Sequence, residues 1–169
     1  DKDRYELKIA GLLHDCGKVT TPVHVVDKAT KLQTIFDRIA LIDTRFEVVR
    51  RDAEIESLRA VLAGEDPDVA ARKLAERHAV LESDRDFLRQ VNRGVESMRE
   101  EDQARVRHIA TAYRWQDEDG EMRDFLSANE MENLTIRAGT LTADERQIIN
   151  HHIVATIKML EALPWPKHL

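Results

Sequence analysis

The sequence lacks the features that mark secreted, membrane-spanning or nucleic-acid-binding proteins. Its only cysteine is Cys16, so it cannot form a disulfide framework or a four-cysteine zinc site, which suits a reducing cytoplasmic location. It has no run of about 18 apolar residues, so we expect no membrane-spanning segment. An excess of positive charge is also missing. The net charge of -6 argues against a nucleic-acid polymer as partner, because binding a phosphate backbone needs a concentrated basic surface, but a small anionic substrate remains compatible.

The length and composition indicate one domain with an appendage. With 169 residues and 42% hydrophobic content, the chain can bury one sizeable core, or a core and an extension, but hardly two full domains. The charged residues Asp1 to Arg4 lead straight into a helical pattern, and the chain stops just after the run Pro164 to Leu169. We therefore expect an excised piece of a longer protein.

The spacing of apolar residues predicts an all-α fold, since no segment has a convincing strand pattern. A first helix should run from about Arg4 to Asp15, with Gly17 as its C-terminal cap. Further along, apolar residues alternate in steps of three and four, as in a coiled-coil seam, at Leu32, Ile35, Ile39, Ile42, Phe46, Val49 and Ala53. This pattern predicts a long helix.

The run Gly64 to Pro67 should break this helix near Ala63, and a second long helix should follow. Its leucines repeat every seven residues, at Leu74, Leu81 and Leu88. We interpret Leu32 to Asn92 as an antiparallel hairpin whose two arms pair with each other. A homodimer formed along the seam is the second interpretation.

Three capping boxes predict further helix starts, because in each of them a hydroxyl and a glutamate satisfy each other's free backbone N–H groups. They are Ser97–Glu100, Ser127–Glu130 and Thr142–Glu145. The helices that they open should end near Tyr113, Leu134 and Leu163, and the last should be stopped by Pro164 and Pro166. The run from Asp117 to Gly120 should be a turn.

The stretch from Gly11 to Lys18, "GLLHDCGK", carries the first candidate site. It places His14 and Asp15 directly behind an apolar run, and burying two adjacent ionisable groups is costly unless a charge such as a metal ion compensates them. Imidazole and carboxylate together bind manganese, iron or zinc readily. Lys18 could reach an anionic oxygen of a substrate bound at the metal, or it could satisfy terminal helix carbonyls, and the local sequence favours neither.

A further candidate ligand lies in the final helix, where two histidines are adjacent. His152 shares a helical face with Thr156 and Met159, whereas His151 falls on the solvent side. A single histidine on an apolar face is more often an ordinary core residue than a ligand. The His-Asp pair on a separate helix strengthens the ligand interpretation of His152.

Together these motifs resemble a known family. The run "AGLLHDCGK" resembles the signature of the HD superfamily of metal-dependent phosphohydrolases. Its combination with "PVHVVDK", "GTLTADE", "INHHIVAT" and "MLEALPWPKHL" is similar to the HD-GYP subfamily. Members of that subfamily hydrolyse cyclic di-GMP with two or three metal ions, often iron or manganese. The resemblance covers about residues 3 to 31 and 139 to 169.

The resemblance implies a role for each candidate residue. His14, Asp15 and His152 would be metal ligands, and Asp15 would bridge two ions. Lys18 would contact the substrate phosphate, and Asp15 and Lys18 would be the catalytic residues. Two rival interpretations stay open: an HD phosphohydrolase that acts on another nucleotide, and a non-catalytic signalling module in which the hairpin binds partners.

The resemblance also implies how the chain is divided. The two parts of an HD-GYP-like core would be residues 1–31 and 139–169. They would be separated by the helical-hairpin insertion at 32–95 and by connecting helices and loops at 96–138. The family's remaining ligands, its Gly-Tyr-Pro motif and an upstream sensor or receiver domain would lie outside this sequence.

Overall fold

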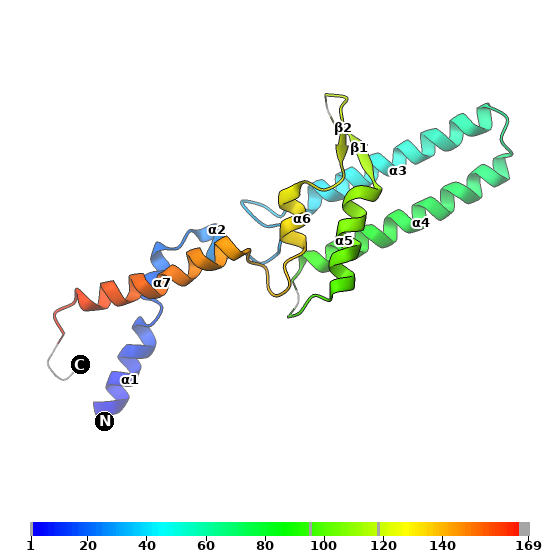
Figure 1. The fold of residues 1–169 in the computed structure, drawn as a ribbon. Coiled ribbons are helices and arrows are strands. Elements are labelled where there is room, and N and C mark those ends of the chain that lie inside the picture. The colour runs from blue at the N-terminus through cyan, green and yellow to red at the C-terminus, as the bar shows by residue number, and fades with distance from the viewer. Residues whose placement is uncertain (1, 95, 118, 166–169) are drawn as a thin grey trace. The chain divides into compact units, whose positions relative to one another are not determined.

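The computed structural model describes residues 2–94, 96–117 and 119–165 (Figure 1). It is mostly helical, which confirms the predicted all-α class, and it adds one small two-stranded sheet. The chain divides into two compact units: unit 1 comprises Asp1–Lys28 and Leu141–Leu169, and unit 2 comprises Ala29–Thr140. Within the described ranges, no helix is long and apolar enough to cross a membrane.

Unit 1 contains the helices α1 (Lys2–Leu13), α2 (Val23–Val26) and α7 (Ala143–Glu161), with a 3-10 helix, η1 (Cys16–Thr20), between α1 and α2. The predicted capping box opens α7: the Thr142 hydroxyl accepts from the backbone N–H of Glu145, and the Glu145 carboxylate accepts from that of Thr142. The helix ends at Glu161, two residues earlier than predicted. Of the two prolines expected to stop it, Pro166 lies outside the described residues.

Gly17 does not cap the first helix, so this prediction is wrong. Helix α1 ends at Leu13, and Gly17 lies inside η1 with no left-handed backbone conformation. It is buried against α7, where its backbone N–H donates to the Thr156 hydroxyl at 2.9 Å. A Cβ atom at this position would lie 2.5 Å from both the backbone nitrogen and the hydroxyl of Thr156. Gly17 is therefore needed for close packing, which the sequence pattern did not reveal.

Unit 2 is built on an antiparallel hairpin of α3 (Ile39–Leu62) and α4 (Pro67–Asn92), as predicted (Figure 1). The chain reverses at Gly64, which has a φ of 101°, and the Asp66 side chain caps α4. The predicted seam is buried between the arms, with Ile42, Phe46, Val49 and Ala53 on α3 and Leu81 and Leu88 on α4. Ion pairs add to this packing, since Arg85 and Arg89 both bind the Asp43 carboxylate.

The beginning of α3 was predicted seven residues too early. Leu32 is fully buried outside the helix, and Ile35 is 97% exposed, so neither belongs to a helical seam. The helix starts at Ile39 because the Asp37 carboxylate accepts from its backbone N–H. Asp37 also accepts from the Asn92 amide, whose own oxygen accepts from the Leu32 N–H. This network fixes residues 30–38 in a loop against the end of α4.

The remainder of unit 2 closes over one side of the hairpin. It consists of α5 (Glu100–Ala112), the strands β1 (Arg114–Gln116) and β2 (Met122–Asp124), and α6 (Ala128–Leu134). The Ser127–Glu130 box caps α6 as predicted. The Ser97–Glu100 box is absent, because α5 begins later, after Arg99, and the Met98 N–H bonds to the Arg137 carbonyl. The strands β1 and β2, which flank the predicted turn at Asp117 to Gly120, were not predicted from the sequence.

The core of unit 2 contains an aromatic cluster of Phe46, Tyr113 and Phe125, with ring centroids 4.5 to 6.0 Å apart. The Tyr113 hydroxyl donates to Asp84 at 2.7 Å. Burial and this contact raise the pKa of Tyr113 well above its usual value. Arg45 joins α3 to α6 through a two-pronged ion pair with Glu130.

Lys31, near the start of unit 2, is held by other residues of unit 2. Lys31 is fully buried, and its ammonium group donates to the carbonyls of Leu134 at 3.1 Å and of Ile136 at 2.8 Å. Its backbone N–H donates to the Asn92 carbonyl. Burial lowers the pKa of Lys31 to about 8.

Candidate metal centre

The predicted site residues of unit 1 come from two segments that are far apart in the sequence. His14 and Asp15 lie between α1 and η1, Lys18 lies in η1, and His152 lies in the middle of α7. Both histidine rings approach the Asp15 carboxylate. Its Oδ2 lies 3.2 Å from His14 Nε2, and its Oδ1 lies 3.4 Å from His152 Nε2. The convergence expected from helical phase is therefore observed.

The burial of the two adjacent histidines on α7 also follows the helical phase. The His152 side chain is 15% exposed and faces η1, whereas His151 is exposed. The hydrogen bond from Gly17 to Thr156 holds η1 against the next turn of the same helical face. Positions 152 and 156 are one turn apart, so this bond positions His152 opposite Asp15.

The hydrogen bonds of both imidazole rings define which nitrogen faces the carboxylate. His14 Nδ1 lies 2.8 Å from the Gly11 carbonyl, and His152 Nδ1 contacts the Ile149 carbonyl. A carbonyl oxygen only accepts, so each Nδ1 carries the hydrogen, and in a neutral ring each Nε2 presents a lone pair to Asp15. A lone pair that faces a carboxylate is unfavourable. The arrangement therefore needs a proton on each Nε2 or a cation between the groups.

Lys18 supplies positive charge to this cluster. Its ammonium group donates to Asp15 Oδ2 at 2.7 Å, and the side chain is 42% exposed. This hydrogen bond is the main reason that the pKa of Asp15 is lowered, with smaller contributions from His14 and His152. In this conformation Lys18 acts as the counter-ion of Asp15, which is neither of the two roles weighed from the sequence.

The donor atoms of His14, Asp15 and His152 are of a kind that binds metal ions, but they are not assembled around one point. Among the described residues, no three His, Cys, Asp or Glu side chains form a group that could hold an ion as they stand. The histidines approach different oxygens of Asp15, and Lys18 occupies one of these. Ligand atoms about 2.1 Å from an ion lie about 3.0 to 3.4 Å apart, which matches the histidine–aspartate distances.

An ion pair between Lys28 and Glu145 in unit 1 was not predicted from the sequence. Lys28 is buried, and its ammonium group donates to both carboxylate oxygens of Glu145, at 2.9 and 2.7 Å. Glu145 therefore caps α7 and also ties the start of that helix to the segment after α2. This pair lowers the pKa of Glu145, against an opposing effect of burial. The capping box predicted the first role of Glu145, but no local pattern predicted the second.

Comparison of the chain with protein-family models, with curated proteins and with solved structures gives no match.

Proposed function

We propose that this chain forms part of a metal-dependent phosphodiesterase that hydrolyses cyclic di-GMP in the cytoplasm. The observation that carries the proposal is the orientation of His14 and His152. Both rings direct Nε2 at Asp15 while Nδ1 bonds to the carbonyl three residues earlier in the chain. Metal-bound histidines are commonly fixed in this way, since the second nitrogen donates to a carbonyl or carboxylate and sets the tautomer.

The roles follow the chemistry of each group. His14 and His152 would hold a divalent ion, iron or manganese, through Nε2, and Asp15 would share its two oxygens between ions. A bound divalent ion would supply Lewis-acid polarisation of the phosphodiester and lower the pKa of water. Three protein ligands are too few for a cluster of two or three ions, so the proposal requires further ligands from outside these residues. An upstream sensor domain is part of the same proposal.

Lys18 is proposed to move from Asp15 to the substrate. Metal binding would neutralise the Asp15 carboxylate and remove the need for the ammonium counter-ion at 2.7 Å. The partly exposed side chain would then be free to place its charge on a phosphoryl oxygen. Lys18 would stabilise charge that develops on the phosphoryl group during hydrolysis.

The test compares ligand and non-ligand variants in the longer protein that contains this chain. Asp15→Ala and His152→Ala should lose bound metal and hydrolysis of cyclic di-GMP. His151→Ala is the matched control, since it removes the adjacent, exposed histidine of the same helix and should retain both. Lys18→Ala should keep its metal and lose about 10²- to 10³-fold in rate, as expected when one oxyanion contact is removed.

The measurements are metal content by elemental analysis and turnover with a known metal occupancy for each variant. Full activity of Asp15→Ala would reject metal-dependent catalysis at this site, and equal damage from His151→Ala and His152→Ala would reject the ligand assignment. Metal loss that affects hydrolysis of another nucleotide but not of cyclic di-GMP would support the rival phosphohydrolase. The 169-residue chain alone should hold well under one ion per molecule, and stoichiometric metal after dialysis would show that other residues form the site.

A further inference from the structure

The half of α3 nearest the turn at Gly64, here called the tip half, carries its large apolar side chains on the face that points away from α4. In the first half of the helix, large residues point toward α4 and are buried, at Ile42, Phe46 and Val49. Beyond Val49 the α3 residues that line the space toward α4 are mostly small, at Ala53, Ser57 and Ala60, with Glu56 beside them. The large residues of this half lie on the outer face, at Ile55, Leu58 and Leu62, where their exposed fractions are 45%, 66% and 88%.

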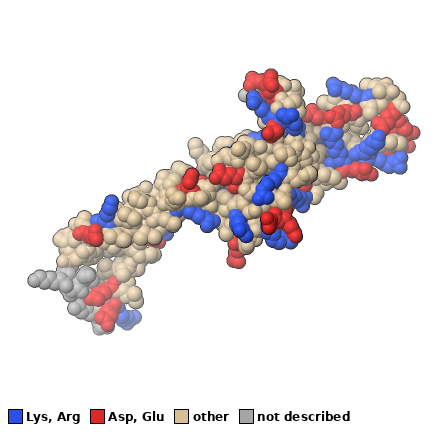
Figure 2. Space-filling view, viewed as in Figure 1, with Lys and Arg blue, Asp and Glu red and all other residues tan. Residues whose placement is uncertain are grey.

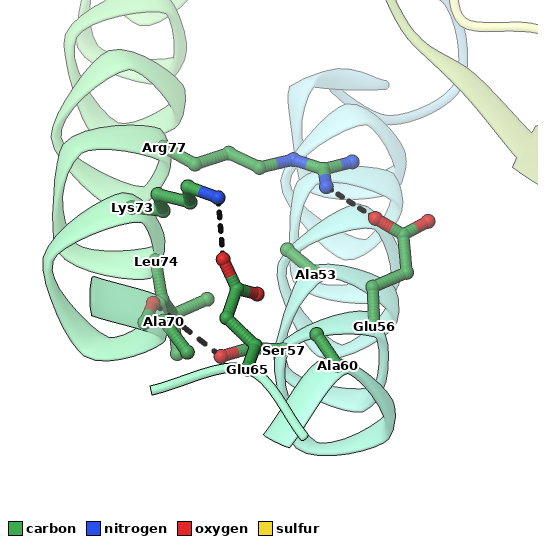
Figure 3. Close-up of a pocket in the computed structure, with 9 residues that line it drawn as sticks. All are labelled: Ala53, Glu56, Ser57, Ala60, Glu65, Ala70, Lys73, Leu74 and Arg77. Carbon is green, nitrogen blue, oxygen red and sulfur yellow. Dashed lines mark hydrogen bonds and ion pairs between the residues drawn. The ribbon is translucent and has the colours of Figure 1, made fainter. Parts of the chain in front are cut away.

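The small inner residues leave space between the arms of the hairpin. A cavity of about 180 Å³ lies there, lined by Ala53, Ser57 and Ala60 of α3 and by Ala70 and Leu74 of α4, among others (Figure 3). Ion pairs between Glu56 and Arg77 and between Glu65 and Lys73 join its walls. Near its tip the hairpin is therefore held together by small side chains and ion pairs. The large apolar side chains of this half of α3, at Ile55, Leu58 and Leu62, do not take part in this packing.

The outer apolar residues form a second coiled-coil seam. Leu41, Val48, Ile55 and Leu62 recur every seven residues, and Leu58 lies three residues after Ile55. Together with Thr44 and Arg51, these positions alternate in steps of three and four from 41 to 62, which is the spacing for packing against another helix. Among the residues that the structure describes, the side chains of Ile55, Leu58 and Leu62 stay exposed and are not covered by another helix.

Two charged residues flank this outer seam and are complementary to each other. Asp52 and Arg59 lie seven residues apart along one side, and neither has an ion pair with any residue that the structure describes. Most of their charged neighbours are paired within unit 2, for example Asp43 with Arg85 and Glu56 with Arg77. Figure 2 shows side chains of both signs crowded over this end of the hairpin.

We propose that the outer face of the tip half of α3 is a docking surface for a second copy of this chain. The two α3 helices would run antiparallel about a two-fold axis near residues 56 and 57. Ile55 of each copy would then pack against Leu58 of the other, and Asp52 of each would meet Arg59 of the other. Such an interface is isologous, because the same patch serves both copies.

The flanking charges select this arrangement over its alternatives. In a parallel pair, a residue on one flank of the seam faces a residue on the other flank, in the next heptad of the partner helix. Glu47 of one copy would then face Asp52 of the other. The parallel pair would also set Glu54 against Arg59, but next to that like-charge contact. An antiparallel pair shifted by one heptad toward the hairpin base would set Asp52 against Asp52 and Glu54 against Glu54. Of these arrangements, only the register centred near the tip pairs Asp52 with Arg59 and sets no like charges opposite each other along the seam from Val48 to Leu62. It also buries the exposed seam residues Ile55, Leu58 and Leu62.

The first experiment measures self-association of the 169-residue chain by sedimentation equilibrium from about 10 to about 500 µM. The seam from Val48 to Leu62 is only about 22 Å long, so we expect a weak dimer with a micromolar dissociation constant. Leu58→Glu should raise that constant at least about 100-fold, because two leucines are lost from each dimer. Val80→Glu is the matched control, since it adds the same charge at a 56% exposed apolar residue of α4 outside the seam.

The second experiment tests the register with charge reversals. Asp52→Arg and Arg59→Asp should each weaken the dimer by about 3- to 10-fold, whereas the double variant should restore it. A mixture of the two single variants should form heterodimers in preference to either homodimer. The proposal is overturned if the chain stays monomeric at about 500 µM, if Leu58→Glu associates as the unmodified chain does, or if the double reversal fails to restore the dimer.

Discussion

Replacement of Gly17 by alanine should separate η1 from α7 and disturb the candidate metal centre. A Cβ atom at position 17 would lie 2.5 Å from the backbone nitrogen of Thr156 and from its hydroxyl, and even closer to the His152 carbonyl. Optimal separation is about 3.5 Å, so the two segments must move apart by about 1 Å or more. Two of these three atoms belong to the backbone of a helix, which cannot rotate away as a side chain could.

The cost of this substitution can be estimated from two effects. Overpacking a close contact typically costs about 1 to 3 kcal/mol, and losing the Gly17–Thr156 hydrogen bond adds about 0.5 to 1.5 kcal/mol. Gly17→Ala should therefore destabilise unit 1 by about 1.5 to 4.5 kcal/mol. It should also reduce metal binding in the longer protein, because His152 lies on the turn of α7 that must shift.

The assay needs a signal from unit 1 alone. The chain has two tryptophans, Trp115 in β1 and Trp165 after α7, so a Trp115→Phe background leaves Trp165 as the fluorescent reporter of unit 1. Urea unfolding followed at Trp165 then gives the free energy difference. The control is Gly11→Ala in α1, where a Cβ atom would have nothing within 4 Å. It should be neutral or stabilise by up to about 1 kcal/mol. Equal stability of Gly17→Ala and the background protein would refute the packing argument.

Three further predictions concern buried groups. Leu81→Ala should destabilise unit 2 by about 2 to 5 kcal/mol, measured by circular dichroism melting, since the side chain is 4% exposed in the hairpin seam. Lys28→Met should destabilise unit 1 by about 3 kcal/mol at Trp165, because Glu145 would lose its buried partner; an unchanged transition would contradict this. The lowered pKa of Lys31 means that the unfolded chain binds more protons between pH 8 and 10, so unit 2 should gain stability as the pH rises through this range. Lys31→Met should remove that gain, and the same slope in both proteins would exclude Lys31 as its source.

Long-period patterns in this sequence predicted structure better than single-residue signals did. The hairpin, its break at Gly64 and its buried seam from Ile42 to Ala53 all followed from repeated spacing, in which many residues support one interpretation. The start of α3 did not, because Leu32 and Ile35 fit the same spacing although Asp37 and Asn92 impose a loop. Such an override depends on a partner 55 positions away, and no local pattern contains it.

The capping boxes were also predicted only in part, because a local pattern does not contain distant contacts. Ser127 and Thr142 cap helices as predicted, whereas Ser97 does not, because Met98 bonds to the distant Arg137 and delays the helix. The strands at 114–116 and 122–124 are too short for an alternating pattern to be visible.

For the candidate site, helical phase placed His152 opposite Asp15 correctly. It could not place Lys18 on Asp15, because that contact depends on the 3-10 turn that replaces the expected helix end. Metal binding at this site and hydrolysis of cyclic di-GMP stay predictions.

The two ends of unit 2 lie close together, and this affects how such a chain can change during evolution. Lys31 and Thr140 both lie against the end of α4, the first through Asn92 and the second through Gly94. A unit whose ends are neighbours can be inserted into a surface loop of another protein, or removed from it, without stretching the host chain. The segment from Ala29 to Thr140 therefore has the properties of a transplantable module. It could be exchanged, lengthened at its tip or grafted elsewhere, while the turn that carries His14 and Asp15 and the helix that carries His152 keep their own contacts.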